Sequence, residues 1–171
     1  MTKLIPILSQ QEIEKKVQET GRKISRDYRD KSLTIVGILK GAVIFLADLT
    51  RNISIDHKID FIGVSSYKGS ASTGQVKLTK HPDLEMSSRD ILIVEDIVDT
   101  GRTLDAMVQY FNTLNPASVK ICALIDKQER RSVEIDVAYS CFFIEKGFIV
   151  GYGLDYNERY RHLPAIYALE F

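Results

Sequence analysis

The chain has no excess of charge of either sign, because its 23 Lys and Arg residues are matched by 23 Asp and Glu residues. Nucleic-acid-binding domains usually carry a basic excess, so this balance argues against a general nucleic-acid-binding role. Cysteine is also scarce, and the only two cysteines, Cys122 and Cys141, lie in apolar stretches. We therefore expect both thiols to be buried and reduced, as in proteins of a reducing compartment.

Long apolar runs are absent as well, and nothing approaches the ~20 apolar residues that a membrane-spanning helix needs. The first eight residues are too short and too polar at their flanks to be a signal peptide. No repeat, linker or low-complexity segment occurs in the 171 residues, of which 44% are hydrophobic. We expect a cytoplasmic protein without membrane contact, folded as a single domain over residues 1–171.

The most informative stretch of the chain runs from Ile91 to Leu104. Its first four residues are apolar without alternation, which is typical of a strand buried on both faces in a parallel sheet. Two adjacent carboxylates, Glu95 and Asp96, follow the strand directly. After Thr103 the apolar residues recur at helical spacing. The stretch therefore predicts a strand, an acidic edge, a polar loop and a helix.

The loop of this unit, Asp99-Thr-Gly-Arg-Thr103, suits a phosphate group. In parallel sheets ligands bind outside the carboxyl ends of strands, and a helix N-terminus there offers N–H groups and a positive dipole end. Gly101 permits close approach of the backbone, Thr100 and Thr103 offer hydroxyl donors, and Arg102 adds a positive charge. The alternative is that Asp99 or Thr100 is only a helix cap.

The carboxylates of Glu95 and Asp96 would repel a phosphate, but they suit sugar hydroxyls or a hydrated Mg²⁺. A phosphate cradle beside acids that bind hydroxyls describes a pocket for a ribose 5-phosphate. A second strand–loop–helix unit has the same design, with a strand over residues 33–39, then Lys40 and Gly41, then a helix over 42–49. Its Lys-Gly turn either faces a pyrophosphate or is a simple turn.

The run from Val94 to Leu104, Val-Glu-Asp-Ile-Val-Asp-Thr-Gly-Arg-Thr-Leu, is similar to the phosphoribosyl-pyrophosphate (PRPP) signature of the type I phosphoribosyltransferases. From about Leu33 onward the chain resembles their hypoxanthine-guanine branch. Arg102 stands where many relatives have Lys, which keeps the charge. The resemblance implies an α/β fold, with a mainly parallel core sheet flanked by helices and a small hood from the terminal segments.

The resemblance also implies an activity: transfer of 5-phosphoribose from PRPP to N9 of hypoxanthine or guanine. The products would be IMP or GMP and pyrophosphate, and the cofactor Mg²⁺. Asp99 would be the general base or proton partner at the purine N7. Lys40 and Gly41, after a non-proline cis peptide, would face the pyrophosphate, and Arg161 would clamp it. The implied metal residues are Glu95, Asp96 and Asp155.

The tail and the next strand would supply the purine site. By resemblance, Lys127 contacts the 6-oxo group, Phe148 stacks on the ring, and the backbone of Ile149 reads its edge. Asp155 holds Mg²⁺ near the base. From the residues alone, Lys127 could equally be a solvated strand-end residue and Phe148 a core residue.

Residues 67–75 are rich in Gly and Ser, which predicts either a mobile loop or a plain surface hairpin tip. By resemblance this is the catalytic lid, with Ser66 and Tyr67 over the reacting centre. The family forms dimers or tetramers, so we expect a homo-oligomer. Two other classes compete with this interpretation, a phosphoribosyltransferase-fold regulator that binds nucleotide and RNA, and a phospho-accepting receiver domain. The balanced charge argues against the first, and the Asp-Thr-Gly-Arg-Thr loop against the second.

Overall fold

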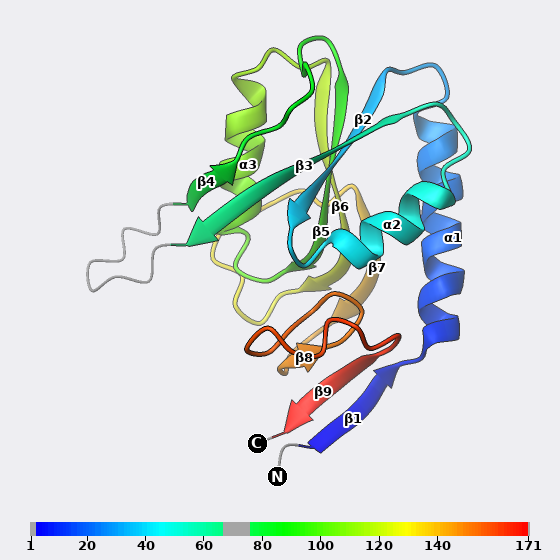
Figure 1. The fold of residues 1–171 in the computed structure, drawn as a ribbon, viewed down its shortest axis with the longest axis vertical. Coiled ribbons are helices and arrows are strands. Elements are labelled where there is room, and N and C mark those ends of the chain that lie inside the picture. The colour runs from blue at the N-terminus through cyan, green and yellow to red at the C-terminus, as the bar shows by residue number, and fades with distance from the viewer. Residues whose placement is uncertain (1–2, 67–75, 171) are drawn as a thin grey trace.

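The computed structural model describes residues 3–66 and 76–170, which form a six-stranded core sheet and a smaller three-stranded sheet (Figure 1). The core order is β4-β3-β2-β5-β6-β7. All neighbours are parallel except β4, which runs antiparallel to β3 at one edge. The strands are β2 (Leu33–Leu39), β3 (Lys58–Ser66), β4 (Val76–Lys80), β5 (Asp90–Val98), β6 (Ser118–Lys127) and β7 (Tyr139–Ile144).

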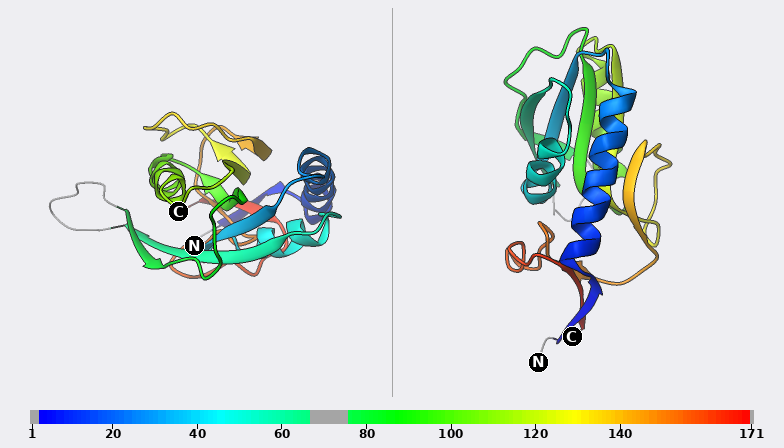
Figure 2. Two further views of the ribbon diagram at one scale, coloured as in Figure 1. Left: turned by 90° about the horizontal axis from the view of Figure 1, so that it is seen from above. Right: turned by 90° about the vertical axis from the view of Figure 1, so that its right-hand side faces the viewer.

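Helices cover both faces of this sheet, as Figure 2 shows. One apolar cluster joins α1 (Gln10–Asp27) and α2 (Val43–Arg51) to side chains such as Leu92 and Val94. The other joins α3 (Arg102–Asn112) to the alternate side chains of the same strand, Ile91 and Ile93. Successive residues of a strand point to opposite faces, so an unbroken apolar run is what a doubly covered strand requires. The predicted α/β fold is confirmed.

The hood is the second sheet, in which β9 (Ile166–Glu170) lies between β1 (Lys3–Leu8) and β8 (Ile149–Val150), all antiparallel. It lies below the carboxyl ends of β2 and β5 in Figure 1. The tail meets the core where Gly153 lies against the turn after β2. A Cβ atom on Gly153 would come 2.3 Å from the carbonyl oxygen of Gly41. Glycine is thus required at this joint.

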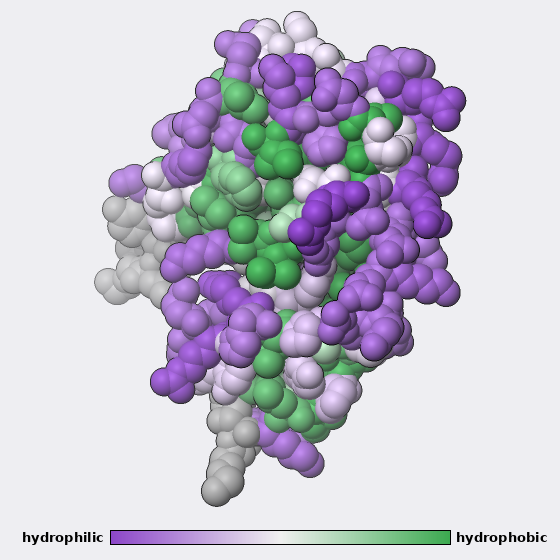
Figure 3. Space-filling model, turned by 45° about the vertical axis from the view of Figure 1, so that its right-hand side comes forward, coloured by the Kyte–Doolittle hydropathy of each residue, from purple (hydrophilic) through white to green (hydrophobic). Residues whose placement is uncertain are grey.

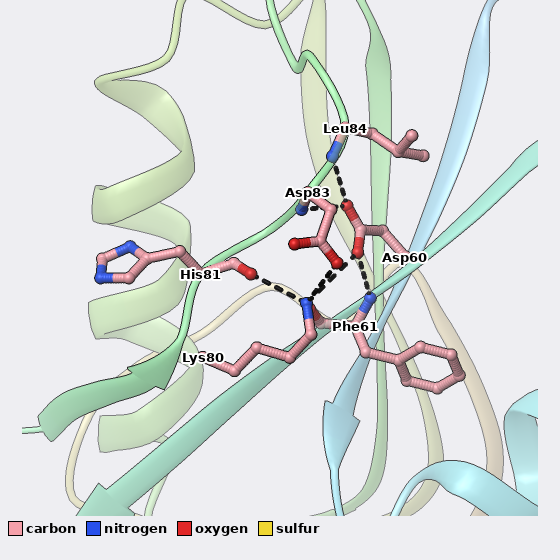
Figure 4. A network of polar contacts seen from close by, with 6 residues as sticks. All are labelled: Asp60, Phe61, Lys80, His81, Asp83 and Leu84. Atoms are coloured by element: carbon pink, nitrogen blue, oxygen red, sulfur yellow. Dashed lines mark hydrogen bonds and ion pairs between the residues drawn. The ribbon is translucent and has the colours of Figure 1, made fainter.

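β4 runs back antiparallel along β3, with Val76 opposite Ser66. A polar network fixes the base of this hairpin (Figure 4). The buried Asp60 carboxylate accepts N–H bonds from Asp83 and Leu84, both at 2.8 Å. The Lys80 ammonium donates to the carbonyl of Phe61 at 3.0 Å and pairs with Asp83 at 2.8 Å.

Cys122 and Cys141 are buried free thiols, as expected. Burial raises the pKa of Cys141 to about 11 and that of Cys122 well above its usual value, so both stay protonated at neutral pH. Within residues 3–66 and 76–170, none of the helices is long and apolar enough to cross a membrane.

The joint between Gly153 and Gly41 predicts a difference between two glycine substitutions. Gly153 and Gly147 both have positive φ, +101° and +106°, but a Cβ on Gly147 would meet nothing within 4 Å. Gly147→Ala should lower the free energy of unfolding by about 1 kcal/mol, the conformational cost alone. Gly153→Ala should lower it by at least ~1 kcal/mol more, because its Cβ meets backbone. Urea unfolding measures the free energy of unfolding of both variants. Equal losses in the two would contradict the close contact between Gly153 and Gly41.

Candidate functional site

A cavity of about 310 Å³ lies at the carboxyl ends of β2 and β5, beside the start of α3. Four separate parts of the chain meet there: the end of β2 with its turn, Val64 of β3, the end of β5 with its loop, and the tail. The predicted site residues in its lining are Gly41, Glu95, Asp96, Asp99, Thr100, Gly101, Thr103, Asp155 and Arg161.

The two adjacent carboxylates lie inside β5, which continues to Val98; the prediction that the strand ends before them is wrong. β5 continues because it keeps pairing with β6 beyond them, with Ile97 opposite Ile125. Glu95 is 9% exposed and Asp96 8%. Burial, together with the charge of Asp96, raises the pKa of Glu95, and burial raises the pKa of Asp96 as well. Two carboxyl groups so placed favour a cation or hydroxyl donors as partners.

The turn after β2 approaches this pair closely. A Cβ atom on Gly41 would lie 1.9 Å from Asp96 Oδ2, so only glycine fits between the turn and the carboxylate. The peptide bond between Leu39 and Lys40 is cis, as the resemblance implies. The Lys40 side chain itself points outward, is 70% exposed, and pairs with Glu158 at 3.0 Å.

The loop after β5 ends at Gly101, which has a φ of +84° and precedes the first residue of α3 without any side-chain cap. The N-cap residue is therefore Gly101 and neither Asp99 nor Thr100, although the Thr100 hydroxyl accepts the N–H of Arg102 at 3.4 Å. An uncapped helix start leaves first-turn N–H groups available to an anionic ligand. The Arg102 guanidinium donates to Ser132 Oγ at 3.1 Å and is not part of the cavity lining, so its predicted charge lies outside the pocket.

Two polar atoms in the cavity wall are buried without a hydrogen-bond partner among the described residues. One is the acceptor Asp99 Oδ1 and the other is the donor Arg161 Nε. The other oxygen of Asp99 lies 3.3 Å from Arg130. Buried polar groups are rarely left unpaired in native proteins. A ligand that donates to Asp99 and accepts from Arg161 would satisfy both atoms.

The loop that carries Asp99 is held from behind by Arg131. Its guanidinium donates to the carbonyl oxygens of Asp99 at 3.1 Å and Val98 at 3.2 Å. It also donates to the carbonyl of Lys127 at 3.2 Å and to the carboxylate of Asp126 at 2.5 Å. One side chain thus ties the ends of β5 and β6 together and fixes the positions of Asp99 and Lys127.

The tail brings a cluster of charges to the cavity. Arg161 donates to the carbonyl of Gly153 at 2.8 Å and pairs with Asp155 at 2.9 Å. Its other close carboxylate, Glu158, lies 3.4 Å away and also binds Lys40. Lys40 lowers the pKa of Glu158, chiefly through their hydrogen bond. The two cations predicted to bind pyrophosphate therefore share one carboxylate here.

Of the predicted purine residues, Asp155 lines the cavity, whereas Lys127, Phe148 and Ile149 do not. Lys127 is only 7% exposed, so the alternative of a solvated lysine is wrong. Phe148 is 46% exposed, so the alternative of a core residue is wrong too. Its ring meets the Tyr156 ring edge-on at 5.4 Å, which places it next to the neighbour of Asp155. Ile149 is buried in β8.

Some predicted residues do not come together. Within residues 3–66 and 76–170, no three His, Cys, Asp or Glu side chains form a metal-binding group. Glu95 and Asp96 are adjacent, whereas Asp155 is engaged by Arg161. The three residues predicted as metal ligands are therefore not one cluster. Tyr67 and the rest of the predicted lid lie outside the described residues, and Ser66 is the last residue of β3.

Sequence reasoning missed Arg131, Glu129, Glu158 and Tyr156. We expect from composition that residues 128–131 are an exposed polar loop, and this is wrong for Arg131, whose side chain is 17% exposed. Its contacts reach back more than 30 residues to Val98 and Asp99, beyond any local pattern. The only available signal was the pair of adjacent arginines, Arg130 and Arg131, close behind the strand that ends in Asp126 and Lys127.

The chain is similar to known proteins in both sequence and structure. Residues 6–157 match the family model described as "Phosphoribosyl transferase domain". A hypoxanthine-guanine phosphoribosyltransferase of Streptococcus pyogenes is 43% identical over 165 residues, which cover 96% of this chain and 92% of the relative. A crystal structure of a hypoxanthine-guanine phosphoribosyltransferase from Bacillus anthracis matches with a TM-score of 0.92 and 38% identity, covering 99% of this chain and 100% of that one. A hypoxanthine phosphoribosyltransferase structure from Staphylococcus aureus matches with a TM-score of 0.93 at 40% identity, covering 96% of this chain and 90% of that one.

The contacts of Arg131 predict that it contributes more to the free energy of unfolding than its neighbour Arg130. Arg131→Lys cannot reproduce the forked set of bonds and should lower the free energy of unfolding by about 1–3 kcal/mol. Arg130→Lys, on a side chain that is 67% exposed, should change it by less than ~0.5 kcal/mol. Hydrogen exchange should also speed up in Arg131→Lys at Ser132 and Val133, whose N–H groups donate to the carbonyl of Thr100. Equal behaviour of the two variants would contradict the role given to Arg131.

Proposed function

The chain belongs to the phosphoribosyl transferase family, and we propose that it is a purine salvage enzyme acting on hypoxanthine and guanine. The reaction transfers 5-phosphoribose from PRPP to N9 of the purine and releases pyrophosphate, giving IMP or GMP. A single observation carries this proposal. The uncapped start of α3, the Glu95–Asp96 pair and Arg161 line one cavity and supply partners for phosphate, sugar hydroxyls and pyrophosphate.

Each part of the substrate has a partner of suitable chemistry. The N–H groups at the start of α3, with the hydroxyls of Thr100 and Thr103, hold the 5′-phosphate. Glu95 and Asp96 accept hydrogen bonds from the ribose hydroxyls. Arg161, whose Nε lacks an acceptor among the described residues, meets pyrophosphate oxygens with its planar fork.

In the chemical step the bond between C1′ and the pyrophosphate oxygen breaks, the bond between C1′ and N9 forms, and the purine loses one proton. Asp99 accepts that proton at N7 through Oδ1, the oxygen that has no partner among the described residues. The positive charge that develops on the ribose is stabilised by the nearby carboxylates, and Arg161 and Lys40 stabilise the leaving group. For this the Lys40 ammonium must leave Glu158.

The donor set suits Mg²⁺, which is usually held by one or two carboxylates together with substrate oxygens and water. Glu95 and Asp96 would hold it on the ribose side, and Asp155 near the base. When bound, Mg²⁺ would neutralise charge on the pyrophosphate.

The purine is held by Lys127, Phe148 and the backbone of Ile149. Lys127 can only donate, so it pairs with the O6 acceptor of hypoxanthine and guanine and has nothing to offer the adenine amine. The Phe148 ring, which is 46% exposed and lies edge-on to the Tyr156 ring, stacks on the purine in this proposal. Discrimination against adenine follows from this donor-only contact.

We further propose that residues 1–171 act as one domain, in the cytoplasm, as a homo-oligomer without nucleic acid or membrane partners. Apolar side chains exposed on α2 and β3 support association: Val43 and Ile44 are 38% and 37% exposed, and Ile59 is 43% exposed. Figure 3 shows apolar surface in the middle of one face, surrounded by polar side chains. Sedimentation equilibrium of the purified protein measures whether it forms dimers or tetramers.

The proposed function is tested with a panel of bases. The protein, PRPP and Mg²⁺ are mixed with hypoxanthine, guanine, xanthine, adenine or uracil, and nucleotide products are separated and measured. IMP and GMP should form readily, and adenine should be poorer in kcat/KM by ~10⁴ or more. No product from hypoxanthine or guanine, or comparable rates with adenine or uracil, would refute the proposal.

The role of Asp99 predicts a loss confined to the chemical step. Asp99→Asn keeps the size of the side chain but cannot take the proton, so kcat should fall by about 10²–10⁴. The KM for PRPP should change by less than about threefold, because the phosphate contacts remain. Asp136→Asn, at an exposed position outside the cavity, is the control and should match the unsubstituted enzyme. An unchanged rate for Asp99→Asn in single-turnover measurements would remove Asp99 from the chemistry.

A further inference from the structure

Glu129 joins two segments that supply different parts of the proposed purine site. Its Oε2 atom lies 3.0 Å from the Lys127 ammonium at the end of β6. The same oxygen accepts the backbone N–H of Gly147 at 3.2 Å, from the turn that leads into Phe148 and β8. The core sheet and the hood are thus connected through one carboxylate oxygen beside the proposed base.

We propose that Glu129 is a positioning residue that sets purine specificity, by holding the Lys127 ammonium and the Gly147–Phe148 backbone in one fixed arrangement. This inference rests on the proposed function and adds to it a residue that contacts no substrate itself. Glu129 determines which direction the donor of Lys127 faces and where the Phe148 ring lies.

The environment of Lys127 shows why it needs such a partner. Its side chain is only 8% exposed, and a buried lysine is rarely stable unless it is paired. Glu129 is its only ion-pair partner among the described residues. An ammonium group has three N–H donors, and one carboxylate oxygen occupies one of them. The remaining donors are available to a carbonyl oxygen such as the purine O6, with their direction set by the first bond.

The turn at Gly147 shows why the second contact matters. Gly147 has a φ of +106°, the left-handed region that glycine adopts readily. Its N–H points back to Glu129, and the next residue is the exposed Phe148. The Phe148 ring in turn contacts Tyr156, next to Asp155 in the cavity wall. Fixing this turn therefore fixes the stacking ring relative to the lysine.

The contacts with Lys127 and with Gly147 both lower the pKa of Glu129, with Lys127 the larger cause. The carboxylate is therefore ionised at neutral pH and accepts both bonds at once. An uncharged amide at this position could still accept from Gly147, but it would lose the charge that holds the ammonium. Glu129→Gln therefore removes the ion pair with Lys127 and keeps an acceptor for the N–H of Gly147.

The test compares Glu129→Gln, Glu129→Asp and the control Glu145→Gln, an exposed acid near the same turn. Steady-state kinetics are measured with hypoxanthine, guanine and adenine at saturating PRPP and Mg²⁺. Glu129→Gln should raise the KM for hypoxanthine and guanine on the order of tenfold, the effect of losing one charge-assisted hydrogen bond. The kcat of this variant and its KM for PRPP should stay within about twofold of the unsubstituted enzyme. The ratio of its kcat/KM for hypoxanthine to that for adenine should fall. Glu129→Asp should recover part of the loss, and Glu145→Gln should behave as the unsubstituted protein.

A double substitution establishes whether Glu129 acts through Lys127. If it does, Glu129→Gln combined with Lys127→Ala should be no worse for hypoxanthine than Lys127→Ala alone, so the two losses do not multiply. Unchanged purine kinetics in Glu129→Gln, with an unsubstituted enzyme active on hypoxanthine, would overturn the inference and leave the proposed function intact. Equal losses for purine and PRPP with reduced stability in urea would also overturn it, because they indicate a purely structural role. An unsubstituted protein that makes no IMP or GMP would instead refute the proposed function.

Discussion

The guanidinium of Arg131 is the contact on which the arrangement of the site depends. β5 and β6 run parallel, and the carbonyl oxygens of Val98, Asp99 and Lys127 all accept hydrogen bonds from Arg131 at the carboxyl ends of the two strands. Arg131 donates to carbonyl oxygens from both strand ends and to the carboxylate of Asp126. Burying so many acceptors without a donor would cost free energy, and a planar five-donor group is the side chain best suited to satisfy them. One guanidinium therefore holds the backbone of both Asp99 and Lys127, the two residues proposed to contact the base.

The fold could be predicted largely from local patterns, because the signals that specify it are short-range. An unbroken apolar run such as Ile91–Val94 predicts a strand covered on both faces, and the structure places helices on each side. The Asp-Thr-Gly-Arg-Thr loop predicted a helix start, and Gly101 does precede α3. The strand boundary was wrong at Glu95 because pairing with β6 outweighs the tendency of charged residues to end a strand. Tertiary contacts decide such boundaries, and sequence alone does not contain them.

The residues proposed to contact substrate could be predicted from the sequence, but the residues that hold them in position could not. The residues proposed to meet substrate have distinctive spacing, whereas the residues that hold them stand in ordinary polar runs. Gln128-Glu-Arg-Arg131 has the composition of any solvated loop, yet Glu129 and Arg131 make long-range contacts. Glu158 lies in a similar polar run, and only the fold shows that it lies between Lys40 and Arg161. Arg102 illustrates the opposite error, because its position in the loop suggests a role in the pocket while its side chain turns away toward Ser132.

The pairing of β1 with β9 constrains the order in which the molecule can be assembled. Lys3 lies opposite Glu170, so one of the first described residues finds its strand partner only when the last described strand has been made. During synthesis β1 is made before the strands of the core sheet, and its pairing with β9 is possible only after those strands have been made. The hood and the tail residues Asp155 and Arg161 come together at the end of this process. Asp155 and Arg161 follow all six strands of the core sheet in the sequence, so this charged part of the pocket is synthesised after the strands that carry Glu95 and Asp96.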